Sequence, residues 1–327
     1  MRAILVTQSG GPQNLQMGEW EQPVPGPREV LVKVAATALN RADILQRRGK
    51  YPPPEGASPL LGLEMSGEVV EVGAEVTRWK VGDPLCGLLP GGGYAAYAVI
   101  HEDLAMPVLP GLDLVSSAAI PEVFLTAFQG LVWLGKLKEG EKLLIHAGAS
   151  GVGTAAIQIS RQIGAEVFVT ASAAKHATCL ALGANKAIDY RAENFQERIE
   201  ELTEGSGVDV ILDVIGGPYF DKNLGSLRLD GRLVLLALMG GIKPLDGNLF
   251  PILRKRLQIT GSTLRNRTQA YKIALSQAFF DFAEKRFAEG KLKPVIDRVF
   301  PWEEVAEAHT YMEANKNIGK ILLKVSE

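Results

Sequence analysis

The chain has 327 residues, more than one hydrophobic core usually holds, and this length predicts two domains. Apolar residues make up 46% of the chain and charged residues 22%, and the formal net charge of −2 gives no strong field for nucleic acid or an anionic membrane. From this composition no nucleic-acid partner is expected, and small molecules are favoured as partners.

Only two cysteines are present, Cys86 and Cys179, and they lie far apart outside any metal-ligand spacing. The sequence therefore predicts neither a disulfide framework nor a cysteine-based zinc site. A cytoplasmic location is expected, because the cytosol keeps thiols reduced. Residues 1–8 read as a strand that a Gly-Pro turn interrupts too early for a signal peptide. No apolar run looks long enough to span a bilayer, so no membrane partner is expected.

In chain order, β-branched runs at 30–36, 67–72 and 94–100 predict a mainly β domain, with loops at 51–54 and 91–93. A helix is expected at 122–134. Strands alternating with helical patterns then follow, at 142–147, 166–171, 187–189, 208–214, 231–237 and 258–264. Six such strands match a doubly wound parallel sheet of the Rossmann type. A long helix over 268–289 precedes two further strands, at 291–299 and 320–325.

These patterns predict an α/β fold in three segments. Residues 1–120 form the first part of a mainly β domain, residues 121–264 form the Rossmann domain, and residues 265–327 return to the first domain. Nothing is repeated internally, and no segment is of low complexity.

The first Rossmann strand runs directly into a small-residue turn and then a helix. The turn contains Ser150, Gly151, Val152 and Gly153. Small residues let the backbone approach a pyrophosphate, and the helix N-terminus stabilises the anion. Ser150 stands where the second glycine of the usual fingerprint is expected and adds a hydroxyl. The alternative is an ordinary strand-to-helix turn, but the six-strand alternation favours a dinucleotide site.

The second strand ends at Thr170-Ala171-Ser172, without the acidic residue that binds the ribose hydroxyls of NAD. A donor at Ser172, a point charge at Lys175 and a hydroxyl at Tyr190 suit a 2′-phosphate, so the sequence predicts NADPH as the cofactor. The alternative is that Ser172 caps the next helix and that Lys175 is simply solvated.

The chain resembles the zinc-independent quinone oxidoreductases of the medium-chain dehydrogenase/reductase superfamily over essentially its whole length. The resemblance rests on Asn40-Arg41-Ala42-Asp43, on Gly82-Asp83 and on the blocks at 62–69, 118–121 and 146–153. Segments 88–93 and 311–320 resemble the tumour-suppressor-inducible NADPH quinone oxidoreductases within that family. The resemblance implies a GroES-like catalytic domain made of both chain ends, with a Rossmann domain between them and the active site in the cleft.

The same resemblance implies that no metal is bound. Zinc-dependent relatives place cysteine where Asn40 stands and histidine where Leu63 stands, so at least two ligands are lost. By similarity, further cofactor contacts fall at Thr126, Ile215, Gly216, Met239, Gly240 and Asn317.

Three polar residues are candidates for catalysis: Asn40, Asp43 and Tyr51. Each has a structural alternative, because Asn40 also suits a helix cap, Asp43 also suits an ion pair with Arg47, and Tyr51 also suits loop packing. Arg265 is expected either to steer an anionic or quinonoid substrate or to form an interdomain salt bridge. His146, inside a strand, is expected to be a hydrogen-bonded core imidazole.

The function that follows is NADPH-dependent reduction of a small-molecule quinone, which needs little activation, either by hydride transfer or by one-electron steps that give semiquinone and reactive oxygen species. Two alternatives remain. One is an NADPH-dependent reductase of enals and enones, with Tyr51 as proton donor, and the other is a non-enzymatic, crystallin-like or regulatory NADPH-binding protein. A homodimer is expected, with an edge strand such as 234–238 paired across a two-fold axis.

Overall fold

The computed structural model describes residues 1–326 and divides them between two units. The terminal unit contains Met1–Leu125 together with the segment from Arg265 onward, and the central unit contains Thr126–Leu264. Helix α3 (Pro121–Phe128) begins where the sequence predicts the second domain to start, whereas the two units divide after Leu125.

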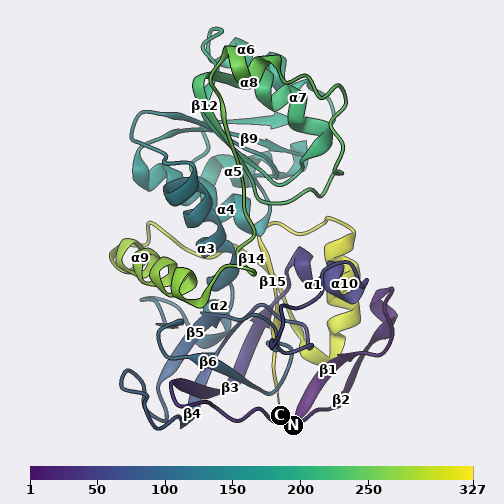
Figure 1. Ribbon diagram of the computed structural model, residues 1–327, viewed down its shortest axis with the longest axis vertical. Coiled ribbons are helices and arrows are strands. Elements are labelled where there is room, and N and C mark those ends of the chain that lie inside the picture. The colour runs from purple at the N-terminus through teal and green to yellow at the C-terminus, as the bar shows by residue number, and fades with distance from the viewer. Residues whose placement is uncertain (327) are drawn as a thin grey trace. The chain divides into compact units, whose positions relative to one another are not determined.

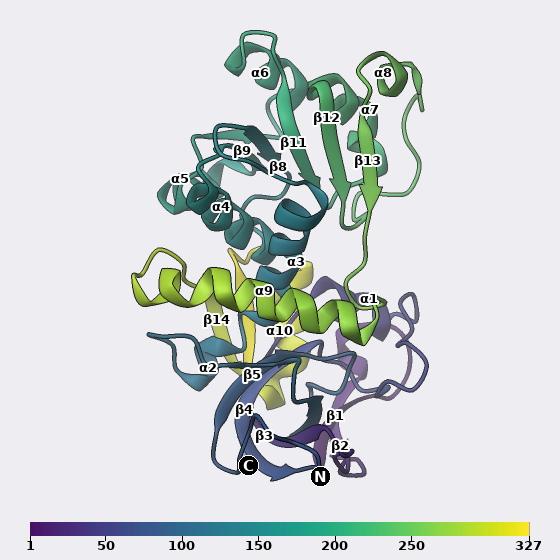
Figure 2. The same ribbon diagram turned by 60° about the vertical axis from the view of Figure 1, so that its left-hand side comes forward.

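The central unit is built on a six-stranded parallel sheet (Figure 2). Its strands are β8 (Lys142–Ile145), β9 (Glu166–Ala171), β10 (Lys186–Asp189), β11 (Val208–Asp213), β12 (Leu227–Leu235) and β13 (Gln258–Gly261). Their spatial order is β10-β9-β8-β11-β12-β13, so the order reverses at β8, the strand that precedes the small-residue turn. All six residues of β11 are buried, as expected of a strand covered on both faces. The predicted doubly wound sheet is confirmed.

Helices α4 (Gly151–Ile163) and α5 (His176–Leu182) pack against each other and contact β8, β9 and β10. Helices α6 (Phe195–Leu202) and α7 (Gly217–Ser226) also pack together, over a core that includes Leu144 and Ile211. The short helix α8 (Phe250–Arg254) precedes β13, and a π-helical segment, η2 (Gln129–Leu134), continues α3.

The structure corrects the strand proposed for a dimer contact. β12 pairs with β11 through Leu233↔Ile211 and with β13 through Leu235↔Gly261, so it lies inside the sheet and not at its edge. The last crossover, through α8, places β13 outside β12. The edge strand on that side of the sheet is therefore β13.

The terminal unit contains a two-stranded sheet, β1 (Arg2–Val6) with β2 (Leu15–Glu19), and a seven-stranded sheet (Figure 1). The larger sheet has the order β14-β15-β3-β4-β5-β7, and β6 pairs with β3. Its strands are β3 (Glu29–Ala38), β4 (Glu64–Val72), β5 (Pro84–Leu88), β6 (Tyr97–His101), β7 (Ala105–Pro107), β14 (Ile296–Pro301) and β15 (Lys320–Lys324). β15 pairs antiparallel with β3 through Leu322↔Ala38, so the C-terminal segment completes a sheet begun near the N-terminus.

Helices of the terminal unit are α1 (Arg41–Arg47), α2 (Leu114–Ser117), α9 (Gln269–Ala288) and α10 (Val305–Glu313). The prediction that no apolar run is long enough to cross a bilayer is wrong by length and composition, because Leu114–Leu134 meets both criteria. Its most apolar window is 72% buried within the protein, however, which is typical of the core helix of a soluble protein. Single-turn 3₁₀ segments occur at Pro12–Asn14, Ala173–Lys175 and Trp302–Glu304.

Candidate active site

In the central unit, the turn between β8 and α4 exposes the start of a helix. Ser150 is the N-cap of α4, and its Oγ accepts a hydrogen bond from the Gly153 amide at 3.0 Å. The Ser150 hydroxyl proton is not used by this cap, so it remains a donor at the mouth of the turn. A helix N-terminus with a spare donor is the arrangement that binds a pyrophosphate.

Two positions in this turn have no room for a side chain, Gly153 because of nearby backbone and Gly148 because of the Val169 side chain. A Cβ on Gly153 would lie 2.4 Å from the Ala147 carbonyl oxygen, and one on Gly148 would lie 2.7 Å from Cβ of Val169. Ala147 itself has φ of 55°, in the left-handed region that alanine rarely adopts. The sequence therefore folds here into a tight strand-to-helix bend, and the predicted cofactor residues Gly151, Val152 and Gly153 form its helical side.

The residues predicted to select the nucleotide lie at the carboxyl ends of two neighbouring strands. β9 and β10 are paired through Ala171↔Asp189, so Ser172 and Tyr190 each follow the end of a paired strand. Ser172 also precedes a single 3₁₀ turn that ends at Lys175, and its side chain makes no capping hydrogen bond. Arg191, which the sequence analysis did not single out, stacks its guanidinium on the Tyr190 ring at 5.8 Å.

The loop that follows β11 and the loop that follows β12 are hydrogen-bonded to each other. The amides of Met239 and Gly240 donate to the carbonyls of Val214 and Ile215 at 3.1 and 2.8 Å. Gly216 has φ of +84°, which other residues rarely adopt, and an added Cβ would lie 3.0 Å from Cα of Leu238, so this bend favours glycine. The structure thus brings together four predicted cofactor residues: Ile215, Gly216, Met239 and Gly240.

Asp213, the last residue of β11, fixes the loop that contains Ile215 and Gly216. Its buried carboxylate accepts hydrogen bonds from the amides of Ile215 (2.6 Å) and Gly216 (3.2 Å) and from the Asn223 side chain (2.9 Å). Asn223 in turn lies 2.7 Å from Nε2 of His146, whose Nδ1 lies 3.0 Å from the Thr170 hydroxyl. Burial lowers the pKa of His146, so it is a neutral imidazole with both nitrogens satisfied. The predicted structural role of His146 is confirmed.

In the terminal unit, Asn40 lies inside a buried charged cluster. Nζ of Lys320 donates to Oδ1 of Asn40, to Oε1 of Glu64 and to the Leu39 carbonyl, each at 2.8 Å. An ammonium has no acceptor, so the amide oxygen of Asn40 must face it. The amide nitrogen donates to Glu64 (2.8 Å) and to the Ala38 carbonyl (3.3 Å). Both donors of Asn40 are therefore engaged within the chain, which favours a structural role.

Asp43 closes the N-terminus of α1. Its carboxylate accepts hydrogen bonds from the amides of Asn40 (2.7 Å) and Gly62 (3.1 Å), as a capping-box residue does. Burial raises the pKa of Asp43 to about 6, against the lowering effect of these two amides. The carboxylate thus joins the start of α1 to the loop that leads into β4.

The alternative ion pair between Asp43 and Arg47 is wrong. Arg47 is fully buried and donates to the Gly10 carbonyl at 3.0 Å, contacts Nδ1 of His309 at 3.0 Å and pairs with Glu313. His309 and Glu313, both on helix α10, are the side-chain partners of Arg47. The Asp43 carboxylate does not reach Arg47, because it points toward the amides at the start of α1. Nε2 of His309 lies 3.1 Å from the Tyr94 hydroxyl, so these groups form one buried chain.

Tyr51, the third catalytic candidate, lies beside Arg265 and Glu122. The Arg265 guanidinium lies over the Tyr51 ring, 5.3 Å from its centroid. Burial raises the pKa of Tyr51 and, more strongly, that of Glu122, which rises to about 8. The like charge of Glu64 adds to the shift at Glu122, whose own amide donates to that carboxylate at 2.8 Å. Glu122 is therefore a carboxylic acid at neutral pH.

Two predicted cofactor residues stand apart from these clusters. Thr126, at the start of the central unit, has a buried hydroxyl with no hydrogen-bond partner among residues 1–326. Asn317, in the terminal unit between α10 and β15, donates to the Gly319 carbonyl at 2.8 Å.

Sequence reasoning missed Glu64, Glu122 and Lys320, the ionisable residues around Asn40. Glu64 and Lys320 belong to segments that the family resemblance identified, but neither carries a local pattern that signals burial. Glu122 reads only as an acidic residue in the first turn of a helix, where such residues are common.

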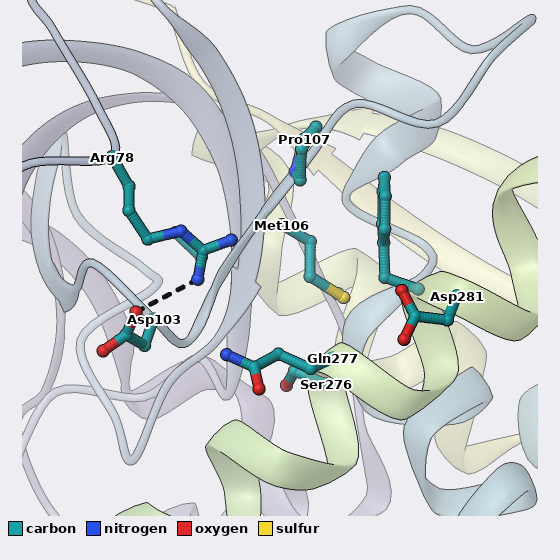
Figure 3. A pocket seen from close by; sticks show the side chains of 9 residues that line it. Arg78, Asp103, Met106, Pro107, Ser276, Gln277 and Asp281 are labelled. Atoms are coloured by element: carbon teal, nitrogen blue, oxygen red, sulfur yellow. Dashed lines mark hydrogen bonds and ion pairs between the residues drawn. The ribbon is translucent and has the colours of Figure 1, made fainter.

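A separate small pocket of about 110 Å³ lies between β7 and α9 (Figure 3). Met106 and Phe280 line it, as does the buried hydroxyl of Ser276, which has no partner among residues 1–326. The charge of Arg78 is compensated by Asp103 at 3.0 Å. The pocket shares no lining residue with the clusters described above.

Two family models match the chain, one within the terminal unit and one that covers most of the central unit and extends past Leu264 into α9. Residues 26–110 match the alcohol dehydrogenase GroES-like domain, and residues 151–279 match the family described as zinc-binding dehydrogenase. A solved quinone oxidoreductase from Pseudomonas syringae pv. tomato DC3000 is 31% identical, with 99% of each chain covered and a TM-score of 0.88. The chain belongs to the medium-chain dehydrogenase/reductase superfamily.

The chain is also similar to an enoyl reductase and to part of a polyketide synthase. The solved CurK enoyl reductase is 30% identical over 99% of both chains, with a TM-score of 0.89. The mycocerosic acid synthase-like polyketide synthase of Mycobacterium tuberculosis is 32% identical over 317 residues, which are 97% of this chain and 15% of that protein. The chain spans about 10–15% of the length of the curated relatives it matches.

Membership of the medium-chain superfamily implies an oxidoreductase with a nicotinamide cofactor, and the central unit fits one. The bend between β8 and α4 presents the N-terminus of α4 capped by Ser150, and the Thr126 hydroxyl is buried without a partner among residues 1–326. A helix N-terminus at the carboxyl edge of a parallel sheet and an unpartnered hydroxyl are groups that a nicotinamide dinucleotide can use.

The zinc of some relatives does not fit the residues around Asn40. Zinc prefers sulfur and imidazole nitrogen ligands, whereas this cluster offers three oxygens arranged around an ammonium. Over residues 1–326, no group of three or more histidine, cysteine, aspartate or glutamate side chains is placed to hold a metal ion.

Proposed function

We propose that this protein is an NADPH-dependent, zinc-independent quinone reductase. The observation that carries the proposal is the buried Asn40–Glu64–Lys320 cluster, in which the Lys320 ammonium donates to Asn40, the position where the family resemblance implies a cysteine in zinc-dependent relatives. Without a Lewis acid at that point, the acceptor must need little activation, and the electron-poor carbonyls of a quinone meet that requirement. Similarity to a quinone oxidoreductase over the whole chain supports the same conclusion.

The preference for NADPH is supported by the carboxyl ends of β9 and β10. No carboxylate follows β9, whereas the hydroxyls of Ser172 and Tyr190 and the charges of Lys175 and Arg191 lie on the segments that follow these paired strands. Cations and donors favour a 2′-phosphate, which a carboxylate would repel.

When bound, the cofactor supplies a hydride. The chain's own residues then have to orient the acceptor and stabilise the charge that develops on its oxygen. Within the terminal unit, Tyr51 and Arg265 are the aromatic and cationic groups available for this, and segments 88–93 and 311–320 support placing the protein near the tumour-suppressor-inducible quinone reductases. The proposal includes reduction of the quinone by one-electron steps, which would give a semiquinone and reactive oxygen species.

The test of this function is a side-by-side assay of NADPH oxidation with 1,2-naphthoquinone, a short enal and a simple aldehyde. We expect turnover with the quinone and a much lower KM for NADPH than for NADH. Lys175→Ala should raise the KM for NADPH about tenfold and leave that for NADH unchanged. Lys186→Ala, at the opposite end of β10, is the matched control. Equal use of NADH, or an unchanged KM for NADPH in Lys175→Ala, contradicts the cofactor assignment.

One observation favours a second candidate, the reduction of an activated carbon–carbon double bond. That reaction needs a proton donor as well as a hydride, and burial keeps Glu122 protonated, with a pKa of about 8, beside the phenol of Tyr51. Similarity to the CurK enoyl reductase supports this candidate. Activity confined to enals in the assay above would select it. If the protein binds NADPH but none of these acceptors causes NADPH to be oxidised, the protein is a binding protein and not an enzyme.

We also propose a cytoplasmic homodimer without nucleic-acid or membrane partners. β13 is a sheet edge, and the segment before it exposes large apolar side chains: Leu238, Met239, Ile242, Leu245, Leu249, Phe250 and Leu253. Exposed apolar groups beside an open strand edge favour self-association. Light scattering after gel filtration should give twice the chain mass, and Leu253→Asp should reduce it, unlike Val81→Asp in the terminal unit. Cell fractionation tests the location.

A further inference from the structure

Arg265 is a buried cation with unused hydrogen-bond donors. The residue is 6% exposed, and its Nε donates to the Pro90 carbonyl at 2.8 Å. Both η nitrogens are buried and have no hydrogen-bond partner among residues 1–326. A guanidinium stays charged in proteins and carries only donors, so four N–H groups of this side chain are left unsatisfied within the chain.

The groups around Arg265 do not neutralise it at pH 7. Tyr51 offers a ring face at 5.3 Å, and its pKa is raised, so the phenol is neutral. Glu122 interacts electrostatically with Arg265 but is itself protonated, because burial raises its pKa to about 8. Lys272 on α9 has the same charge as Arg265. Asp43 also attracts Arg265, but its carboxylate is held by two amides of its own.

A glycine, Gly91, lies beside the guanidinium of Arg265. A Cβ on Gly91 would lie 3.5 Å from Nη2 of Arg265 and 2.5 Å from the Ser58 carbonyl oxygen. The amide of Gly92 donates to the Leu60 carbonyl, which fixes this loop against the segment that follows Tyr51. The same loop supplies the Pro90 carbonyl that accepts from Nε. Its next residue, Gly91, has no side chain that could contact the η nitrogens.

A buried charge without a partner is strongly unfavourable, and proteins normally supply one. The planar fork of a guanidinium matches a carboxylate, which can accept two parallel hydrogen bonds. We infer that Arg265, flanked by the Tyr51 ring, is a binding site for a carboxylate group carried by the substrate. The inference rests on the proposed function only in taking the ligand to be the electron acceptor, and it narrows the acceptor to aromatic or conjugated carbonyl compounds that bear an acidic group.

Binding of a matched pair of ligands tests the site without turnover. The full chain, with and without NADP⁺, is titrated calorimetrically at pH 7 with 2-naphthoate and with 2-naphthamide, which has the same shape and no charge. We expect 2-naphthoate to bind at least about tenfold more tightly, the effect of one hydrogen bond to a charged group. Arg265→Gln should abolish this difference. Arg267→Gln, with the same charge change two residues further on, should preserve it.

Equal affinities for the two ligands in the wild-type protein overturn the inference, as does a preference that survives Arg265→Gln. If Arg265→Gln does not fold, Arg265→Lys replaces it. That variant keeps the charge and loses the planar fork, so it should retain only part of the preference, and an undiminished preference also counts against the site.

Glu122 provides an independent pH-dependent test. The charged and titratable groups that act on it are Glu64 on β4, Lys320 on β15, Asp43 on α1, Lys272 on α9, and Tyr51 and Arg265. Above pH 8, ionised Glu122 becomes a counter-ion for Arg265 and competes with the ligand. Affinity for 2-naphthoate should fall about tenfold from pH 7 to pH 9 and stay level in Glu122→Gln. An equal fall in both proteins contradicts this coupling.

A kinetic comparison separates this inference from the proposed function. NADPH oxidation is measured with 1,4-naphthoquinone and with its 2-carboxylate, and kcat/KM for the two is compared in wild type and Arg265→Gln, so that their intrinsic reactivities cancel. If 2-naphthoate binds as expected and neither quinone is reduced, the quinone reductase proposal fails and the site stands. If both quinones are reduced and the ratio is the same in the two proteins, the site fails and the function stands.

Discussion

Replacing Glu122 with glutamine should stabilise the protein at neutral and alkaline pH. The carboxyl has an ordinary pKa of 4.5, and burial followed by the charge of Glu64 raises it to about 8 in the folded state. At about 1.4 kcal/mol per pKa unit, this pKa difference between the folded and unfolded chains corresponds to about 5 kcal/mol. Because the unfolded chain releases this proton at lower pH than the folded chain, stability falls as pH rises from about 4.5 to about 8.

The size of the effect at pH 7 follows from the same numbers. Holding the proton on Glu122 at pH 7 costs about 3 kcal/mol relative to the unfolded chain. Glu122 is only partly buried as a residue, so solvent screening reduces the expected gain to about 2–3 kcal/mol. For a unit of this size, that gain corresponds to a rise in melting temperature of about 4–12 °C.

The assay is thermal unfolding of wild type, Glu122→Gln and Glu21→Gln at pH values from 5 to 9. Glu21 is exposed and serves as the matched control. The advantage of Glu122→Gln should be small at pH 5, grow to pH 8 and then level off, while Glu21→Gln should follow wild type. An advantage that is constant with pH, or that shrinks as pH rises, would refute the reasoning.

Lys320→Met should lower stability by about 3–5 kcal/mol in thermal unfolding, because it leaves the buried Glu64 carboxylate without its counter-ion, and adding Glu64→Gln should restore much of the loss. No recovery in the double variant would count against this ion pair. Gly153→Ala should weaken nicotinamide cofactor binding about tenfold in a fluorescence titration, since its Cβ would lie 2.4 Å from the Ala147 carbonyl oxygen; unchanged affinity would show that the bend can relax. His309 has its pKa lowered from 6.5 to about 3 by burial and then by Arg47, so the unfolded chain binds its proton first and stability should be lost as pH falls from 6.5 toward 3. Melting temperatures of His309→Gln should depend less steeply on pH in that range, and equal slopes would contradict the assignment.

The elements that the sequence predicted well are those with a local pattern. The six strands of the central sheet were identified because each is a short apolar run bounded by turn residues, and the bend at Ser150–Gly153 because a strand, small residues and a helix follow one another directly. Both signals lie within a few neighbouring residues, where chain connectivity alone fixes the geometry.

Strand order and the charged cluster depended on tertiary structure. The sequence suggested β12 as an edge, but the crossover through α8 decided that β13 lies outside it. Glu64 forms hydrogen bonds with Asn40, Glu122 and Lys320. These residues are separated from it by 24, 58 and 256 positions in the chain, respectively. Sequence supplied the ionisable groups, but only the folded chain brings them out of water and together, and that desolvation makes Lys320 a fixed counter-ion and Glu122 an acid at neutral pH.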